Sequence, residues 1–593
     1  MKQYFFILFI FNLFTVNAQQ ETDSLAQTNK EYETVLFNDN NFLDILFYKH
    51  FNNTPISNLG TYGSSFYFPT TYNLDNQKNV FAPTSVKDKL FKLEGFKPFT
   101  NLTWINAGRR EQILSLNHIQ KFGKLASLHF NYKRVSSPGI YINQEANQNL
   151  FTGDFRFNTD NNLYQLRLAA EIDRIENQEN GGLADITDFE KDSLGRRSLY
   201  TVNNEQSYYT LKQTNVEVSQ RLNFINSKID SIRSNKVYVG LENEYNTKRR
   251  SYFDYDISSP IYAETYLDST SKFWVDSTFA KYFRNTINLG FDNGKFSVQG
   301  SFDYYQHEYN QFMGIDSNFN SFYAGLMIGY KTNKTITNAN FSYGLNGYNA
   351  DDVNSSIHVK YKPTEILTIG LEGSYKLIEP ELYYKNFISN HFKWINDSLE
   401  KEQTIYFGAK VKLEKYRLTL FANAKLRDNF MYFDTLVNLI QHDFATNNIS
   451  LGVEKDYRIY KFHFKTALIY QITSDDVIMP LPNIVARQVV YYENKLFKRS
   501  LKVRVGANAS FTSDYYAYEF MPSISQFYAQ NKNEIGAYPY VDFFISTHLK
   551  RAQVFFKWEH INAGMSGYSY LLTPTTPAHD RSFKFGVSWN MFD

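Results

Sequence analysis

Apolar and polar residues alternate with a period of two along most of this chain. In residues 124–133, one face carries Ala126, Leu128, Phe130 and Tyr132. The same alternation recurs in residues 164–173, 295–304, 405–413, 416–426, 461–470, 501–511 and 583–590. Because successive side chains of a β-strand point to opposite faces, each run predicts a strand with one apolar and one polar face. The chain is therefore expected to be an all-β protein.

Soluble β-sandwiches and β-propellers also show this alternation. The length of the alternating runs distinguishes these soluble folds from a membrane barrel. Many of the runs reach ten residues, whereas strands of soluble proteins average about 5–6 residues and a tilted membrane strand needs about 9–11. Tyr132, Tyr304 and Tyr470 lie at run ends, where aromatic rings suit the membrane–water interface. The mean hydropathy of -0.45 argues against apolar membrane helices. These features predict a transmembrane antiparallel β-barrel.

The links between the runs alternate between short and long. Short links fall at residues 121–124, 158–162, 292–294, 331–334, 362–365, 414–415, 455–458, 496–499 and 550–551. Longer polar segments lie at residues 136–149, 175–206, 254–278, 310–318, 346–354, 380–401, 428–442, 473–486, 512–534 and 562–580. Residues 108–110 are predicted to form a short outer turn, and residues 223–236 a long inner link. Since outer-membrane barrels have short periplasmic turns, long extracellular loops and an even strand number, this rhythm predicts about 22 strands.

The N-terminal part of the chain lacks sustained alternation. Residues 1–18 are predicted to be a secretory signal peptide, because a short apolar stretch ends in a cleavage site before Gln19. Residues 19–97 are expected to form a periplasmic N-terminal segment. Two interpretations of it stay open: residues 58–69 fold back into the barrel mouth, or the segment is an ordinary disordered terminus. The barrel is expected to occupy residues 98–593.

Several stretches resemble a known family. Residues 98–151, together with ENQENGGL at residues 176–183, are similar to the opening strands of the "putative porin" family of Bacteroidetes outer-membrane β-barrels. FKFGVSWNMFD at residues 583–593 is similar to the closing strand of that family, and ISNLGTYGSSFYFP at residues 56–69 adds to the likeness. The resemblance implies a barrel in the bacterial outer membrane and the passage of solutes through it.

The last predicted strand is expected to carry the signal for insertion into the outer membrane. Such signals usually end on an aromatic residue, but here Phe592 is penultimate and Asp593 is last. The predicted insertion signal therefore consists of Phe583, Phe585, Val587, Trp589 and Phe592.

The residues that face the lumen decide what a pore admits. If the polar strand faces point inward, the basic lumen residues are Arg156, Arg167, Lys410, Lys412, Arg417, Lys425, Lys461, Lys465, Lys502 and Arg504. The acidic residues on these faces are Asp154, Glu171, Asp173, Asp303 and Glu559. Because rings of Lys and Arg favour anions, the sequence predicts passive passage of small hydrophilic solutes with a mild anion preference. In the alternative interpretation, the charges pair with acids and merely fill a wet lumen.

Catalysis is not expected, so the protein is predicted not to be an enzyme. Ser127 and His129 share one strand face, but residues two apart on a strand are separated by about 7 Å, too far for a direct hydrogen bond. No metal site and no cofactor are expected, and the formal net charge of +2 gives no reason to expect a nucleic-acid partner.

The expected partners are outer-membrane lipid, the barrel assembly machinery during insertion, and further outer-membrane proteins. The long outer loops fit a second function as well as they fit a channel. In that alternative, a closed barrel acts as an accessory or scaffold subunit of an outer-membrane transport, secretion or assembly complex.

Overall fold

The computed structural model describes residues 98–228, 234–255, 259–267, 273–311 and 315–592. The predicted signal peptide (residues 1–18) and the segment 19–97, with both of its interpretations, lie outside the described residues. Among the described residues, no helix is both long and apolar enough to cross a membrane.

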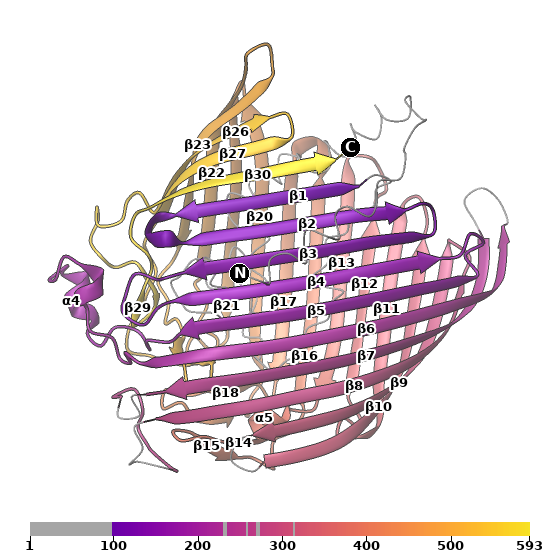
Figure 1. Cartoon of the computed structure of the whole chain (residues 1–593), viewed down its shortest axis with the longest axis horizontal. Coiled ribbons are helices and arrows are strands. Elements are labelled where there is room, and N and C mark those ends of the chain that lie inside the picture. The colour runs from indigo at the N-terminus through magenta and orange to yellow at the C-terminus, as the bar shows by residue number, and fades with distance from the viewer. Residues whose placement is uncertain (1–97, 229–233, 256–258, 268–272, 312–314, 593) are drawn as a thin grey trace, which may run out of the picture. The chain divides into compact units, whose positions relative to one another are not determined.

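Twenty-two antiparallel strands form one closed sheet (Figure 1). The first half comprises β1 (Phe99–Ala107), β2 (Gln112–Phe122), β3 (Ala126–Ser137), β4 (Ala146–Asn158), β5 (Tyr164–Gln178), β6 (Ser207–Lys228), β7 (Ser234–Asp254), β8 (Trp274–Asp292), β9 (Phe296–Gln311), β10 (Ile315–Lys331) and β11 (Thr335–Gly347). The second half comprises β12 (Val353–Tyr361), β13 (Leu367–Ile378), β16 (Glu402–Leu413), β17 (Leu418–Asp428), β20 (Thr446–Ile459), β21 (Phe462–Thr473), β22 (Ile484–Leu496), β23 (Leu501–Thr512), β26 (Tyr540–Leu549), β27 (Ala552–Glu559) and β30 (Ser582–Phe592). The predicted fold class and strand number are confirmed.

The barrel closes by pairing its first strand with its last. Phe99 of β1 is in register with Phe592 of β30, and Ala107 is in register with Lys584. Closure leaves no unpaired edge strand among the described strands of the barrel sheet. This is the condition for a sheet to satisfy its backbone hydrogen bonds in lipid. The start of β1 and the end of β30 therefore lie at the same rim, the one that carries the short turns.

On the barrel strands, polar side chains are buried and apolar side chains are exposed, which is the reverse of the pattern in a soluble protein. On β5, the side chains of Glu171 and Asp173 are 0% and 1% exposed, whereas Leu168 and Ile172 are each 41% exposed. Polar residues thus face the interior and apolar residues face outward. A sheet with this polarity is stable only if lipid covers its outer face.

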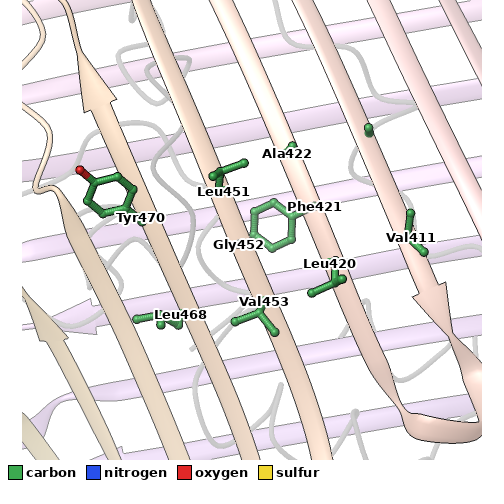
Figure 2. A pocket seen from close by; sticks show the side chains of 10 residues that line it. Val411, Leu420, Phe421, Ala422, Leu451, Gly452, Val453, Leu468 and Tyr470 are labelled. Carbon is green, nitrogen blue, oxygen red and sulfur yellow. The ribbon is translucent and has the colours of Figure 1, made fainter.

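The outer face of β16, β17, β20 and β21 is apolar and has a shallow depression of about 450 Å³ (Figure 2). Leu420, Leu451 and Leu468 are among its lining residues. Beside them the ring of Phe421 lies against Gly452, where an added Cβ atom would come within 2.0 Å of the ring. The ring therefore occupies the space that a side chain at position 452 would need, and glycine leaves room for it.

Two predicted links differ from the structure. The predicted long inner link at residues 223–236 is wrong, because β6 continues to Lys228 and β7 already begins at Ser234. Likewise, β9 and β10 extend into the predicted outer link at residues 310–318. Where a hairpin continues past the hydrocarbon core, backbone pairing holds it without an apolar face, so alternation does not mark its ends.

Short elements lie in the links between the barrel strands. The helices are α4 (Ile186–Glu190) and α5 (Leu382–Lys385), and the 3-10 turns are η3 (Gly108–Arg110), η4 (Arg197–Leu199) and η5 (Glu414–Tyr416). The short strands are β14 (Asn386–Ile388), β15 (Lys393–Ile395), β18 (Met431–Phe433), β19 (Leu439–Gln441), β24 (Glu519–Met521), β25 (Gln526–Tyr528), β28 (Leu571–Thr573) and β29 (Thr576–Pro577). Apart from η3 and η5, these elements lie in the long loops.

Candidate channel interior and loop cap

Most of the basic residues predicted to line the lumen lie on barrel strands. They are Arg156, Arg167, Lys410, Lys412, Lys425, Lys465, Lys502 and Arg504. The acidic residues predicted on the same faces, Asp154, Glu171, Asp173, Asp303 and Glu559, also lie on barrel strands.

Arg417 and Lys461 lie in turns at the short-turn rim, not on strands as predicted. The turn η5 and the left-handed conformation of Arg417 (φ 47°) reverse the chain, so β17 begins two residues later than the predicted run, at Leu418. Lys461 precedes β21, and its Nζ donates a hydrogen bond to Oδ1 of Asn494 (3.0 Å). The alternation of polar and apolar residues could not predict that Arg417 and Lys461 lie in turns. Side chains at a chain reversal do not follow the period of two that holds along a strand.

Arg156 of β4 and Arg167 of β5 are ion-paired on the inner wall. Nε of Arg156 lies 2.6 Å from Oδ1 of Asp154, and Nε of Arg167 lies 2.5 Å from Oδ2 of the same carboxylate. Nη1 of Arg167 also lies 2.8 Å from Oε1 of Glu217 on β6. Two cations and two buried carboxylates therefore form one continuous chain in which the charges balance.

A second set of pairs lies on β22 and β23. Oε2 of Glu493 accepts from Nε of Arg504 at 2.8 Å and lies 3.0 Å from Nζ of Lys502. Elsewhere, Nζ of Lys412 lies 2.8 Å from a carboxylate oxygen of Glu414. Many of the predicted basic residues thus have acidic neighbours, which reduces their combined attraction for anions.

Lys410 on β16 differs from these residues. Its side chain is exposed, and among the described residues no carboxylate lies within ion-pair distance of it. It faces the same side of β16 as Lys412, because the two are two positions apart along the strand. Of the predicted lumen cations that lie on barrel strands, Lys410 is therefore the one whose charge is least compensated.

A cluster around Glu244 was not predicted from the sequence. Oε2 of Glu244 lies 2.7 Å from Nη2 of Arg284, and Oε1 accepts hydrogen bonds from the hydroxyl of Tyr282 (2.6 Å) and from Nδ2 of Asn215 (2.8 Å). The polar residues at positions 242 and 244 follow a period of two, which is the signal that could have placed them on the inner wall. Their partners come from β6 and β8, and a pattern within one strand cannot identify them.

Another buried cluster lies beside the closing seam. Nζ of Lys557 and Nζ of Lys584 each lie 2.9 Å from a carboxylate oxygen of Glu559. Nζ of Lys584 also lies 3.3 Å from Oε2 of Glu111, in the outer turn between β1 and β2. Because buried charges must be paired to be tolerated, this cluster favours the pairing of β27, β30 and β1 in one register.

The long loops at the opposite rim contact one another and form one assembly, which we call the loop cap. It comprises residues 179–206, 379–401, 429–445, 513–539 and 560–581. Within it, β19, β18, β25 and β24 form a four-stranded sheet from two different loops. Phe433 of β18 is in parallel register with Tyr528 of β25. Oε1 of Glu519 then accepts a hydrogen bond from Oγ1 of Thr573 (2.7 Å), which joins a third loop to this sheet.

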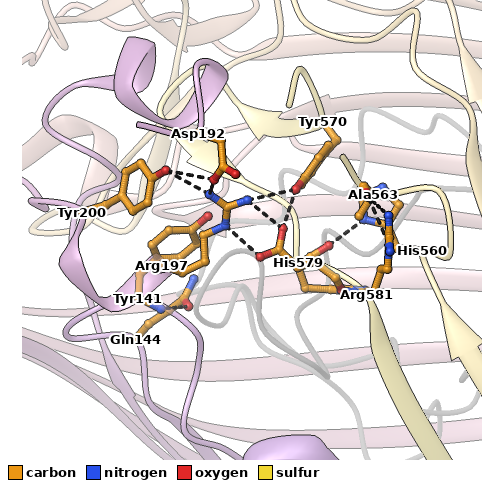
Figure 3. Close-up of polar contacts among 11 residues, drawn as sticks. Tyr141, Gln144, Asp192, Arg197, Tyr200, His560, Ala563, Tyr570, His579 and Arg581 are labelled. Atoms are coloured by element: carbon orange, nitrogen blue, oxygen red, sulfur yellow. Dashed lines mark hydrogen bonds and ion pairs between the residues drawn. The ribbon is translucent and has the colours of Figure 1, made fainter. Parts of the chain in front are cut away.

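Arg197 holds two loops of the cap together (Figure 3). Its Nε lies 2.7 Å from Oδ2 of Asp580, and its Nη1 lies 2.9 Å from Oδ1 of Asp192. The guanidinium also lies 4.6 Å above the ring of Phe189, a favourable cation–π geometry. Burial raises the pKa of Asp580, but hydrogen bonds from Arg197 and Tyr570 outweigh it and hold this pKa below its usual value.

One loop of the cap reaches across the barrel mouth to the opposite wall. Residues 513–539 leave the barrel between β23 and β26, yet they contact β7, far away in the strand order. Arg250 of β7 is fully buried, and its Nε donates to Oγ of Ser525 (3.1 Å). Its Nη2 donates to the carbonyl oxygens of Pro522 (3.2 Å) and Ser523.

Apolar packing supports the same contact. Phe520 and Phe527 of the loop pack in one cluster with Tyr209, Leu211 and Tyr252 of the barrel wall. The sequence predicted these loops only as long polar segments. Their large aromatic residues were the available signal that the loops have a core of their own, since solvated loops rarely carry many such side chains.

The chain is similar to one protein family and to several solved structures. The model of the family described as "Putative porin" matches residues 15–593. No curated protein sequence matches the chain. Among solved structures, the copper transporter OprC is similar at 9% identity and a TM-score of 0.60, with 84% of this chain and 82% of that chain covered.

Two further solved structures show the same likeness of fold. The FrpB iron transporter from Neisseria meningitidis (F5-1 variant) has 10% identity and a TM-score of 0.57, over 84% of this chain and 83% of that one. The siderophore receptor PiuA from Acinetobacter baumannii has 12% identity and a TM-score of 0.57, over 84% and 82%. The closed 22-stranded barrel and the family match place the protein in the bacterial outer membrane. The chain belongs to the "Putative porin" family.

Proposed function

We propose that the protein is an outer-membrane channel for the passive passage of small hydrophilic solutes, narrowed at its outer mouth by the loop cap. The observation that carries the proposal is the polarity of the wall, with buried polar groups such as Glu171 inside and exposed apolar groups such as Leu168 outside. The polar wall excludes lipid, and inner-face residues that keep an exposed side chain, such as Lys410, can contact a hydrated solute. No catalytic step is part of the proposal.

The proposed selectivity is a mild anion preference. The pairs formed by Asp154 and Glu493 neutralise much of the basic charge on the wall. Lys410 keeps an exposed ammonium group, and Arg156 shares its carboxylate with a second arginine. Since the remaining excess of positive charge is small, we expect weak discrimination rather than exclusion of cations.

Conductance of the purified full chain in planar bilayers tests this proposal. We expect discrete single-channel steps of low conductance, because the cap covers the mouth. In a salt gradient, the reversal potential should have the sign of a weakly anion-selective pore. Absence of steps with protein that is folded and inserted would overturn the channel, and a clear cation preference would overturn the selectivity.

The loop cap also favours a second function. Its loops are joined by the sheet of β18 and β25 and by the ion pairs of Arg197, so they present a preorganised outer surface. Such a surface suits a closed barrel that serves as an accessory or scaffold subunit. A stable protein partner that co-purifies at native expression, together with absence of conductance, would favour this function over the channel.

A further inference from the structure

A small cavity lies where the inner wall of β7 to β10 meets the links that follow β11 and β13. Its volume is about 200 Å³. Six of its lining residues carry rings: Tyr282, His307, Tyr309, Phe319, Tyr348 and Tyr383. Drug-sized ligand pockets have volumes of about 300–1,000 Å³, so this cavity matches a smaller molecule with about one ring.

Three of the rings continue a row of aromatic contacts along the wall. The rings of Tyr305 and His307 are stacked, with centroids 5.5 Å apart, and those of His307 and Phe319 are stacked at 4.6 Å. The ring of Phe319 lies 4.7 Å from that of Tyr348. His307 and Phe319 are directly opposed in the register of β9 and β10, so the strand pairing itself builds this row. Both side chains are only half-buried and leave ring surface free for a ligand.

A hydrogen-bond donor beside the rings is left unused. Asn246 of β7 lines the cavity and is 2% exposed. In the described part of the chain, its Nδ2 has no hydrogen-bond acceptor. An unsatisfied buried donor is costly, and a ligand oxygen at this position would remove that cost.

The charged groups around the cavity are compensated in two ways. Lys281 and Glu308 alternate with Tyr282 and His307 along β8 and β9, so this ion pair (2.5 Å) faces away from the inner-wall rings. Glu379 contacts Lys385 and also lies 3.4 Å from Nζ of Lys401. Glu379 is therefore engaged by lysines, and the two other charged lining residues of the inner side, Lys248 and Glu381, have opposite charges, so the cavity has no clear excess of charge that would select a cation or an anion.

From these features we infer that the cavity is a binding subsite for a neutral polyhydroxylated ring, the chemistry of a monosaccharide unit. Ring faces carry partial negative charge and attract the C–H groups on one face of a pyranose. The Asn246 amide would donate to one sugar hydroxyl, and the carboxylate of Glu379 can still accept from another. The inference deepens the proposed channel function and rests on it for the route by which the sugar arrives.

Calorimetric titration of the detergent-solubilised full chain tests the subsite without any need for conductance. Glucose and maltose are the probes, with choline as a cationic probe and inorganic phosphate as an anionic one. We expect both sugars to bind and the two ionic probes not to bind. Phe319→Ala should weaken sugar binding about tenfold, which corresponds to about 1.4 kcal/mol.

Matched variants distinguish a loss of sugar binding from a loss of folding. Phe319→Tyr keeps the ring and should retain binding, whereas Asn246→Leu keeps the size but loses the donor and should weaken it. Tyr406→Ala removes an aromatic residue of β16, which does not line the cavity, and should bind like the unmodified protein. Heat-modifiable mobility in electrophoresis reports whether each barrel is folded.

The outcomes separate the subsite from the channel. If folded protein binds neither sugar, or binds choline or phosphate instead, the inference fails even when conductance is normal. If the sugars bind but no conductance appears, the subsite stands and the proposed channel fails. An equal loss of sugar binding in Phe319→Ala and Tyr406→Ala would also overturn the assignment to this cavity.

Discussion

Arg250 combines full burial with a positive charge, and it depends on the loop cap for its hydrogen bonds. Its acceptors are Oγ of Ser525 and the carbonyl oxygens of Pro522 and Ser523. Its guanidinium also lies 5.8 Å from the centroid of the Tyr209 ring. A buried cation without such partners would be strongly unfavourable, so the loop and the wall stabilise each other through this residue.

Arg250→Met should therefore loosen the loop at residues 513–539. The change leaves buried carbonyl oxygens without donors, each at a cost of about 1–3 kcal/mol. We expect higher single-channel conductance and faster proteolysis within this loop in the intact outer membrane. Arg249→Met is the matched control, because Arg249 is the exposed neighbour on the same strand and packs over Phe279. Unchanged conductance and proteolysis in Arg250→Met would contradict the anchoring role.

Charge selectivity depends on single residues in the same way. Lys410→Gln removes the least compensated of the predicted lumen charges on the barrel strands and should move the reversal potential in a salt gradient toward zero. Lys415→Gln removes an exposed charge from the turn η5 and should have little effect. An equal shift in both variants would mean that diffuse surface charge, and not the lumen residue, sets the preference.

At the scale of elements, the loops of the cap depend on buried titratable groups at the strand ends. Glu179 follows directly after β5 and is buried. Burial raises the pKa of its carboxyl from 4.5 to about 8, against the opposing charge of Arg250. The carboxyl is thus neutral in the folded loop at neutral pH, whereas in an opened loop it would be ionised.

The sign of the resulting pH dependence follows from this difference. The raised folded pKa stabilises the loop most at low pH, and this contribution is lost as the pH rises from the ordinary value of 4.5 to about 8. We expect the free energy of opening of residues 179–206 to fall by up to about 1.4 kcal/mol per pH unit in this window and to level off above it. Hydrogen exchange of the loop measures this energy.

Two variants isolate the contribution of this carboxyl. Glu179→Gln keeps the neutral state at every pH and should flatten the profile. Glu205→Gln, at an exposed position of the same loop, should leave the profile unchanged. A profile that is just as steep in Glu179→Gln would assign the titration to another group.

At the scale of the whole molecule, stability depends on lipid outside and polar contacts inside. Leu451 of β20 is 54% exposed on the outer face, and Glu454 of the same strand is an exposed residue of the opposite face. Leu451→Arg should destabilise the folded barrel by about 2–4 kcal/mol if its depth is near the membrane midplane. Glu454→Arg should have a much smaller effect.

Unfolding by urea in lipid vesicles measures both variants. A larger loss of stability in Glu454→Arg than in Leu451→Arg would reverse the assignment of inside and outside. Because that assignment underlies the proposed channel, this comparison is also the simplest test of the architecture.

The strands could be predicted because their signals are local. The period of two at residues such as Leu168 and Glu171 defines two faces, and the short links define the chain reversals. Where the alternation of apolar and polar residues ends, the sequence no longer predicts the backbone. The turn at Arg417 and the extension of β6 to Lys228 therefore differ from the predicted strands. Both depend on backbone pairing and chain reversal, which need no particular alternation of side chains.

The sequence by itself thus determined that this protein is a β-barrel of the outer membrane with a polar interior, since the alternation separates two faces and the length of the runs and the rhythm of the links indicate a membrane barrel. Only the tertiary structure decided which interior charges neutralise each other, as with Arg167 between Asp154 and Glu217. It also decided that a distant loop reaches Arg250 across the mouth and that His307 and Phe319 form one aromatic row. These contacts join residues far apart in the chain, and their energies depend on distances that no local pattern encodes.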